Sequence, residues 1–326
     1  MTTDFRPLRD TDYGALASLL NEASVADGRA QHQVAEEIRE EFESHPVDLA
    51  TQTFAAWHGE RLVGAVYLIY LPSAVREERC YVFGAVHPDH RGLGIGRRLL
   101  QWGLEHGTNL LQSSRSDLPK YLRVDISRTN TSAIRLHERL GLQPIRYFAD
   151  LRADLSEPTP TRRAPSAAST TTTFRIVLWD LSRNEEARHV KNAAFTDHWG
   201  STPTPSDWWT TQTSGFGARP DWSFFAVNND DKIIGHLITH RFENDDELLG
   251  AKYAVIDNIG TLAEWRGRGV ASQLITSALA KYREEGMQFA ALGVDSDNPT
   301  GAYRLYESLG FRPWRESVTY QRVIRA

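Results

Sequence analysis

The chain has 326 residues, a formal net charge of -5 and a sequence pI of about 6.1. This length suits about two domains, and the mild acidity gives no general attraction to nucleic acid or to an anionic membrane surface. The single cysteine, Cys80, excludes an internal disulfide, and the lack of an apolar leader or an 18-residue apolar span leads us to expect a cytoplasmic protein without a membrane partner.

The first half of the chain alternates apolar runs with turns in an order typical of an α/β domain. The predicted elements are, in order, strands at 54–57, 62–71 and 80–86, a helix from Ile95, a strand at 121–126 and a helix that ends at Gly141. A glycine-rich turn lies between the third strand and the first of these helices.

A polar stretch from Ser156 to Thr173 then interrupts the pattern. It is rich in Ser, Thr, Pro and Ala, and it has no apolar periodicity, so it cannot bury enough surface to offset the entropy of ordering the chain. We therefore predict a first domain at 1–155, a linker at 156–173 and a second domain at 174–326.

The second half repeats the order of the first. The predicted elements are strands at 224–227, 232–239 and 253–261, a helix from Val270, a strand at 289–294 and a helix that ends at Gly310. Gly64 and Gly235 occupy matching places in the second strand of each half. The repeated order predicts a duplicated α/β domain.

Each half carries a glycine-rich turn between a strand and a helix, Arg91 to Arg97 and Arg266 to Ser272. Glycine lets a ligand approach the backbone, and the first amides of a helix attract an anion, so this arrangement favours phosphate binding. A Rossmann fingerprint is excluded because its third glycine would fall on Arg97 or Ser272, and neither turn has the spacing of a P-loop.

The remaining pattern, Arg-x-x-Gly-x-Gly/Ala, resembles the GNAT superfamily of N-acetyltransferases, whose turn of this form holds the pyrophosphate of acetyl-CoA. A second GNAT pattern, Asn-x-x-Ala-x-x-x-Tyr-x-x-x-Gly-Phe, is matched twice, with one extra residue after the Asn in the second half. The matching residues are Asn130, Ala133, His137, Gly141 and Leu142, and Asn298, Ala302, Tyr306, Gly310 and Phe311. The resemblance covers nearly the whole chain apart from the linker.

The resemblance implies two tandem domains, each with a central twisted mixed sheet flanked by helices, and the arrangement looks most like the mycothiol synthase family. Members of that family acetylate a cysteine linked to an amino sugar. The likeness is architectural, so it leaves the substrate open, and the segment from Phe195 to Gly200 is not one we associate with that family.

The resemblance also implies which residues contact acetyl-CoA, namely the end of the strand before each turn, the turn itself and the Asn of the later helix. In the first half these are Gly84, Ala85, Val86, Arg91, Gly92, Leu93, Gly94, Ile95, Gly96, Arg97 and Asn130. In the second half they are Ile259, Gly260, Thr261, Arg266, Gly267, Arg268, Gly269, Val270, Ala271, Ser272 and Asn298. We expect no metal.

Two positions distinguish the halves where the chemistry would occur. A protonated amine needs a base, and aligning the two turns places Asp257 opposite Val82, on the strand face shared by Ile259 and Thr261 if side chains alternate regularly. The acid that protonates the departing thiolate in this superfamily is the tyrosine of the later helix. That residue is Tyr306 in the second half and His137 in the first, so we predict catalysis in the second domain.

Structural roles remain open for each of these residues. Tyr306 also fits a core tyrosine, Asp257 also fits a turn cap or an arginine partner, and His137 fits a surface histidine, a proton donor or a neutral replacement. Aromatic residues gather near the expected acceptor side, where they could stack on a ligand but more often form a core or lid. They are Trp199, Trp208, Trp209, Phe216 and Trp222.

The predicted activity is transfer of an acetyl group to a primary amine of a small molecule or peptide, by a monomer or a homodimer. One alternative is a non-catalytic acyl-CoA sensor or scaffold, and another is an aminoacyl transferase on a doubled fold of the same kind. An acidic run at 243–247 could attract a cationic amine or form a solvated loop.

Overall fold

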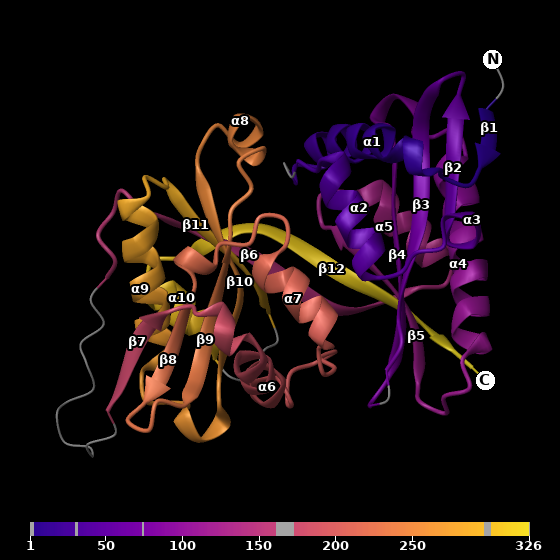
Figure 1. Ribbon diagram of the computed structural model, residues 1–326. Coiled ribbons are helices and arrows are strands. Elements are labelled where there is room, and N and C mark those ends of the chain that lie inside the picture. Colours follow the sequence, from indigo (N-terminus) through magenta and orange to yellow (C-terminus); the bar gives the residue numbers. More distant parts are fainter. Residues whose placement is uncertain (1–2, 30–31, 74, 161–172, 297–300, 326) are drawn as a thin grey trace. The chain divides into compact units, whose positions relative to one another are not determined.

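The computed structural model describes residues 3–29, 32–73, 75–160, 173–296 and 301–325, and the chain forms two compact units (Figure 1). Unit 1 comprises residues 1–147 and 316–326, and unit 2 comprises residues 148–315. Within the described residues, each unit is a mixed six-stranded sheet with helices on both faces. The α/β class predicted from the sequence is confirmed.

The sheet of unit 1 has the strand order β1-β2-β3-β4-β5-β12. The strands are β1 (Thr3–Arg6), β2 (Thr53–His58), β3 (Arg61–Leu71), β4 (Glu78–Val86), β5 (Lys120–Ser127) and β12 (Arg312–Ile324). The helices are α1 (Tyr13–Ala26), α2 (Ala35–Ser44), α3 (Leu49–Gln52), α4 (Ile95–Ser113) and α5 (Thr131–Arg139). β4 and β5 run parallel, and the other neighbouring strands run antiparallel.

The apolar residues of β3 are buried on both faces of the sheet, which explains its nearly continuous hydrophobic sequence. Val66 and Leu68 pack with Leu99 and Leu104 of α4 on one face. Residues of α1 and α2 cover Ala65, Tyr67 and Ile69 on the opposite face.

The sheet of unit 2 has the strand order β6-β11-β10-β9-β8-β7. The strands are β6 (Gln143–Asp154), β7 (Phe174–Leu178), β8 (Phe224–Asn228), β9 (Ile233–His240), β10 (Tyr253–Thr261) and β11 (Phe289–Asp295). The helices are α6 (Asn184–Ala194), α7 (Ser206–Ser214), α8 (Asp245–Leu249), α9 (Val270–Glu284) and α10 (Ala302–Ser308). β10 and β11 form the parallel pair, as β4 and β5 do in unit 1.

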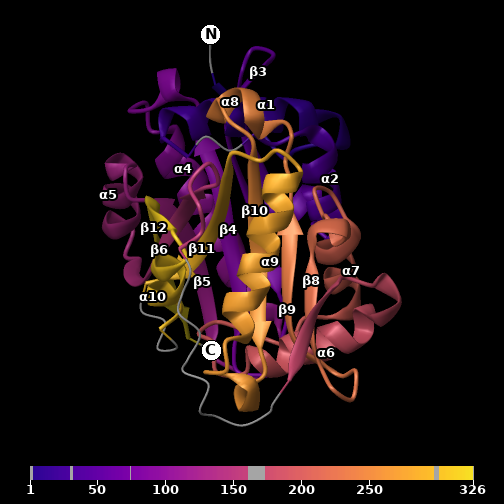
Figure 2. The same cartoon turned by 90° about the vertical axis from the view of Figure 1, so that its left-hand side faces the viewer.

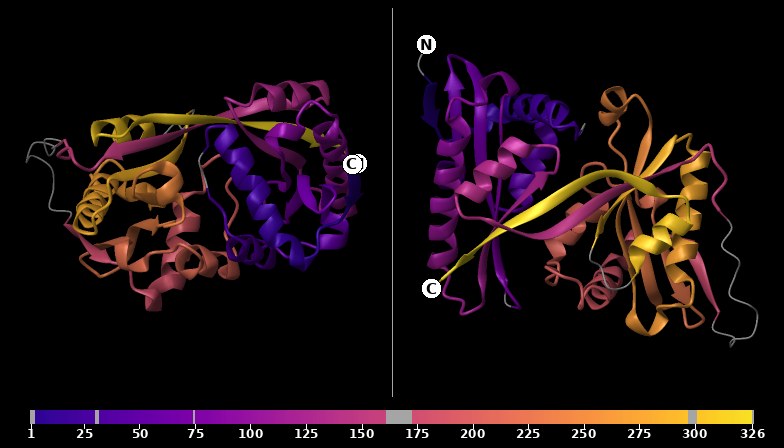
Figure 3. Two further views of the ribbon diagram at one scale, coloured as in Figure 1. Left: turned by 90° about the horizontal axis from the view of Figure 1, so that it is seen from above. Right: turned by 180° about the vertical axis from the view of Figure 1, so that it is seen from behind.

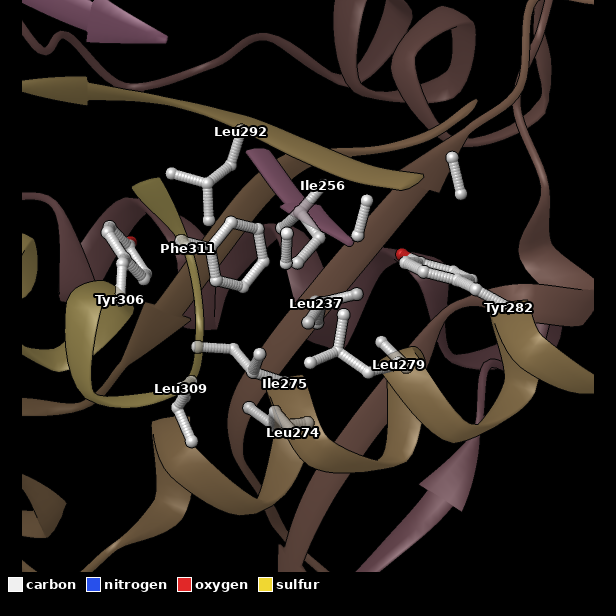
Figure 4. Packing of buried hydrophobic residues seen from close by; sticks show 14 of the residues in the cluster. Leu237, Ile256, Leu274, Ile275, Leu279, Tyr282, Leu292, Tyr306, Leu309 and Phe311 are labelled. Carbon is white, nitrogen blue, oxygen red and sulfur yellow. The ribbon is translucent and has the colours of Figure 1, made fainter. Parts of the chain in front are cut away.

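The main core of unit 2 lies between α9 and the sheet (Figure 4). Leu274, Ile275 and Leu279 of α9 face Leu237 and Ile256 of the central strands. The opposite face of the sheet packs against α6 and α7 in a smaller cluster (Figure 2). The two faces of this sheet therefore pack against different helices, one against α9 and the other against α6 and α7.

Each unit contains a strand from the other half of the chain. β12 pairs with β5 of unit 1, from Ser317 opposite Ser127 to Ile324 opposite Lys120 (Figure 3). β6 pairs with β11 of unit 2. The two homologous halves have therefore exchanged their last strands.

This exchange makes the compact units differ from the domains predicted at 1–155 and 174–326. Residues 156–173 follow β6 and precede β7, two strands that both pair within unit 2. Residues 161–172 of that segment lie outside the described residues. The amino-acid composition shows which segment of the chain is polar. It does not show that the strand before this segment, β6, pairs within unit 2.

Candidate functional site

In each unit the two parallel strands separate before they end. β4 and β5 pair from Glu78 opposite Lys120 to Tyr81 opposite Arg123, after which β4 continues to Val86 beside β3 alone. The pairing of β10 with β11 likewise stops at Ile256 opposite Leu292. Each sheet is therefore open between these strands at the end that leads into the glycine-rich turn.

The glycine-rich turns have the geometry of an anion site. Gly92, Gly94, Gly267 and Gly269 have φ values of +79°, +85°, +74° and +85°, and a Cβ at any of them would meet no atom within 4 Å. Gly94 and Gly269 are the N-caps of α4 and α9, and no side chain caps either helix within the described residues. Open space above uncapped first-turn amides fits the phosphates of an acyl-CoA.

The arginine of each turn is bonded within its own unit. In unit 1, Arg91 donates from Nη1 and Nη2 to Asp27 at 2.8 and 3.2 Å, and from Nε to the Val86 carbonyl at 3.2 Å. The same Asp27 carboxylate accepts from Nδ2 of Asn130 at 2.8 Å. Asp27 therefore connects Arg91, which follows β4, with Asn130, which follows β5.

In unit 2, Arg266 donates to the carbonyl of Ala194 at 2.8 Å and to that of Thr261 at 3.4 Å, and its Nη1 lies 3.9 Å from the Asp197 carboxylate. Both arginines therefore tie the turn to a strand end and to an early helix of the unit. The loop amides, rather than these guanidinium groups, face the open space.

The other predicted contact residues occupy these same elements. Gly84, Ala85 and Val86 form the end of β4 that pairs with β3 but not with β5, and Ile259, Gly260 and Thr261 form the end of β10 that pairs with β9 but not with β11. Leu93 is exposed, Ile95 and Val270 are buried in the cores, and Gly96, Arg97, Ala271 and Ser272 lie in the first helical turns. Arg268 lies over the ring of Trp265. Asn298 lies outside the described residues.

Tyr306 and His137 occupy corresponding places on α10 and α5, and both are buried. The Tyr306 ring packs against Phe311, as Figure 4 shows, and its hydroxyl forms no hydrogen bond with a described residue. Burial raises the pKa of Tyr306 to about 12, so the hydroxyl stays protonated. His137 donates from Nδ1 to the Ala133 carbonyl at 2.7 Å, and burial lowers its pKa, so the imidazole is neutral.

A β-bulge corrects the predicted orientation of Asp257. The register between β10 and β9 shifts between Ile256 and Asn258, so Asp257 is the extra residue of the strand. Ile259 packs toward the α9 core, whereas Asp257 accepts a 2.6 Å hydrogen bond from Gln212 of α7 on the other side. The expectation that Asp257 shares a face with Ile259 was wrong because regular alternation does not survive a bulge.

The bulge brings a group of polar side chains together on the α6/α7 side of unit 2. His240 donates from Nε2 to the Gln212 carbonyl at 2.8 Å, and its Nδ1 lies 3.8 Å from the Asp257 carboxylate. The neighbouring Asn258 accepts from Nε2 of His236 at 2.8 Å. Sequence reasoning missed His236, Asn258 and Gln212.

One signal could have found His236. It follows Gly235 in an otherwise apolar strand, at the place that Ala65 takes after Gly64 in the first half. Unit 1 has Ala65, Phe83 and Ala85 where unit 2 has His236, Asn258 and Gly260, and all three belong to or pack against an apolar cluster. At these three positions the sheet face is therefore apolar in unit 1, whereas in unit 2 it carries the polar pair His236 and Asn258.

The aromatic residues near the expected acceptor side divide between the faces of the sheet. Trp209 is buried in the α6/α7 cluster and donates to the Asn184 carbonyl at 2.8 Å, and Trp222 is buried in the α9 core. The acidic run includes the first residues of α8, where Asp246 pairs with Arg241.

In the described parts of the chain, no helix is long and apolar enough to cross a membrane, and no group of three His, Cys, Asp or Glu could hold a metal.

Comparison with solved structures finds the same fold over essentially the whole chain. A GCN5-related N-acetyltransferase from Sphaerobacter thermophilus matches with a TM-score of 0.75 at 24% identity, covering 99% of this chain and 96% of that one. A tandem GNAT protein from the clavulanic acid biosynthesis pathway matches with a TM-score of 0.69 at 18% identity, covering 100% and 99%.

Sequence relatives add a closer relationship. Mycothiol acetyltransferase of Thermobispora bispora is 31% identical over 246 residues, which are 73% of this chain and 74% of the relative. Mycothiol acetyltransferase of Streptomyces coelicolor is 29% identical over 322 residues, 94% of this chain and 90% of the relative. The model of the acetyltransferase (GNAT) family matches residues 16–142 and 184–311. The chain therefore belongs to the GNAT family, as a tandem N-acetyltransferase homologous to mycothiol acetyltransferases.

Proposed function

We propose that this enzyme transfers the acetyl group of acetyl-CoA to the primary amine of a small polar molecule, of the kind acetylated by its mycothiol acetyltransferase relatives, and that unit 2 carries out the chemistry. The observation that carries this proposal is the polar cluster at the bulge of β10, in the unit that also contains Tyr306. Homology over most of the chain supports a small-molecule acceptor rather than a peptide.

The donor site combines the two features found at the end of each parallel strand pair. The amides of the Gly267 to Ser272 turn would hold the pyrophosphate, because they are uncapped and open to solvent. The end of β10 that has separated from β11, Ile259 to Thr261, would align the rest of the acyl-CoA and offer an amide to the thioester oxygen. Acyl-CoA supplies the thioester, and the remaining steps belong to side chains of the protein.

Asp257 is the proposed base. It lies where β10 leaves β11, and its carboxylate is held by Gln212, so it can take a proton from an ammonium group directly or through water. The neutral amine then attacks the thioester carbon, the new C–N bond forms and the C–S bond breaks. The acetylated amine, the thiol of CoA and one proton are the products.

Tyr306 is the proposed donor to the departing sulfur. Its hydroxyl is protonated and forms no hydrogen bond with a described residue, so it can donate as negative charge develops on sulfur. The proton that it gives is replaced by one that the amine loses. His137 in unit 1 is neutral, with its Nδ1 hydrogen committed to Ala133, and is less suited to this role.

Unit 1 is proposed to bind cofactor or to support unit 2. Its turn shares the open amides of the second, but Ala65, Phe83 and Ala85 stand where unit 2 has His236, Asn258 and Gly260. In addition, Asp27 joins Arg91 to Asn130 across the ends of the separated strands. These features favour a structural or binding role over a second reaction centre.

Steady-state release of CoA with a panel of amines tests the proposed function. The panel contains amino-sugar-linked cysteine, simple alkyl amines and a lysine peptide, and the small polar amine is expected to have the highest kcat/KM. If acetyl-CoA binds tightly but no amine produces turnover, the result contradicts the proposed activity and favours a non-catalytic acyl-CoA sensor. Preference for the peptide would contradict the acceptor assignment.

A further inference from the structure

His236 of β9 lies across the neighbouring strand β10. Its side chain is fully buried, and its Cε1 is 2.5 Å from the position that a Cβ on Gly260 would take. Its Nε2 lies 2.8 Å from Oδ1 of Asn258, two residues earlier on β10. The imidazole therefore covers the face of β10 at the point where that strand has separated from β11.

The contact with Asn258 determines which ring nitrogen of His236 carries the hydrogen and which atom of the Asn258 amide remains free to donate. Because the amide oxygen accepts, Nε2 carries the hydrogen of the imidazole, and Nδ1 has no hydrogen-bond partner among the described residues. Burial lowers the pKa of His236 to about 4, so the ring is neutral over the whole physiological range. The oxygen of Asn258 is engaged, and no described residue accepts from its Nδ2, so both Nδ2 hydrogens can be donated to another acceptor.

The bulge places Asn258 directly beside the proposed base. Asp257 contacts Gln212 of α7, and Asn258 contacts His236, whose ring packs edge-on against Trp209 of the same helix. Two consecutive residues of β10 therefore face the α7 side. An amine bound at the Asp257 carboxylate would have the Asn258 amide next to it.

Unit 1 shows that this fold does not require the arrangement. Ala65 opposite Ala85 replaces His236 opposite Gly260, and Phe83 replaces Asn258. The histidine and the glycine belong together, because any Cβ at residue 260 would overlap the imidazole. Where unit 1 has a contact between two alanines, unit 2 has a buried imidazole, and the one hydrogen bond that this imidazole forms with a described residue orients the Asn258 amide.

We propose that Asn258 donates a hydrogen bond to a hydroxyl or carbonyl oxygen that the acceptor carries next to its reacting amine, and that His236 is the positioning residue that fixes the Asn258 amide. This inference rests on the proposed function of unit 2 and names its substrate class as oxygen-bearing amines. An alkyl amine without such an oxygen would leave the Asn258 hydrogens unpaired.

Two matched acceptors test the inference with the full chain. S-methyl-L-cysteinamide has a carbonyl beside the carbon that bears its amine, and S-methylcysteamine lacks it. The amide is expected to have about 3- to 10-fold higher kcat/KM, as one neutral hydrogen bond allows. Asn258→Ala should remove that preference by raising the KM of the amide about 3- to 10-fold, while the KM of acetyl-CoA stays unchanged.

His236 is tested through the same preference. His236→Ala should lower it, and His236→Gln, whose amide can still donate to Asn258, should restore it at least in part. The His236→Ala/Gly260→Ala double variant reproduces the pair found in unit 1 and lacks the donor. With the imidazole gone, the new Cβ would still lie 3.0 Å from the Phe195 ring and 3.3 Å from the Ala194 Cβ, so these neighbours must shift slightly. The double variant should fold and still lose the preference.

The outcomes separate this inference from the proposed function. Equal kcat/KM for the two amines in the unaltered enzyme, or an unchanged preference in Asn258→Ala, overturns the role of Asn258. An unchanged preference in the double variant overturns the role of His236. If Tyr306→Phe also leaves turnover unchanged, then the assignment of chemistry to unit 2 has failed with it.

Discussion

Removing the hydroxyl of Tyr306 tests the division of labour between the units most directly. Tyr306→Phe keeps the ring that packs against Phe311 and deletes an oxygen that bonds to no described residue. Because no buried partner loses its hydrogen bond, the free energy of unfolding should change by less than about 0.5 kcal/mol. Any loss of activity can then be read as chemistry rather than as unfolding.

The expected loss of rate follows from the role of the hydroxyl. A positioned acid contributes about 10²- to 10⁴-fold, which corresponds to about 3–5 kcal/mol of transition-state stabilisation. Burial raises the pKa of Tyr306 to about 12, so the hydroxyl is protonated in every molecule at neutral pH, and its removal affects the whole population. The decrease should appear in kcat, with the affinity for acetyl-CoA nearly unchanged.

His137→Phe is the matched control, because His137 holds the same place on α5. It should lower kcat by less than about 2-fold, although loss of the bond to Ala133 should cost about 1 kcal/mol of stability. The assay is CoA release under saturating acetyl-CoA, with a thermal melt of each variant. If His137→Phe lowers kcat more than Tyr306→Phe does, the assignment of catalysis to unit 2 is refuted.

Three further predictions concern the turn, the base and the buried imidazole. Gly269→Val should abolish one acetyl-CoA binding event in calorimetric titration, whereas Gly286→Val, at a φ of +74° with equally open surroundings, should strain the backbone without changing the stoichiometry. Asp257→Asn should lower kcat/KM about 10²-fold, and equal rates would exclude it as the base. The pKa of His236 is about 4 in the folded state and about 6.5 when unfolded, so unfolded chains bind the extra proton and stability is lost as pH falls from about 6.5 to about 4. His236→Gln should reduce that loss by about 3 kcal/mol at pH 4, and parallel stability curves would contradict the burial of the ring.

The fold class and the repeated elements were predictable because their signals are local. β10 begins and ends at the predicted residues, Tyr253 and Thr261, and α4 and α9 follow the glycine-rich turns as predicted and contain the predicted Ile95 and Val270. Alternating apolar residues and glycine turns act over a few neighbours, so the sequence displays them directly.

The features that were not predicted depend on contacts distant in sequence. The bulge at Asp257 appears only in the register with β9, and it reverses the side on which that carboxylate lies. The His236–Asn258 bond joins two strands, and neither residue stands out until the halves are superposed. The exchange of β6 and β12 involves pairing partners that are distant in sequence, such as Phe289 with Asp154 and Ser317 with Ser127, for which a single sequence carries no signal.

That exchange has a consequence for biosynthesis. Chains emerge from the ribosome from their N-terminus, and most domains can fold once their own residues are out. Here the sixth strand of unit 1 ends at Ile324, so β5 is paired with β4 but lacks its second neighbour, β12, until all of unit 2 has been made. Unit 1 must wait with an exposed sheet edge, the kind of edge that invites pairing with other chains. The sheet of unit 1 can therefore close only after unit 2 has been synthesised.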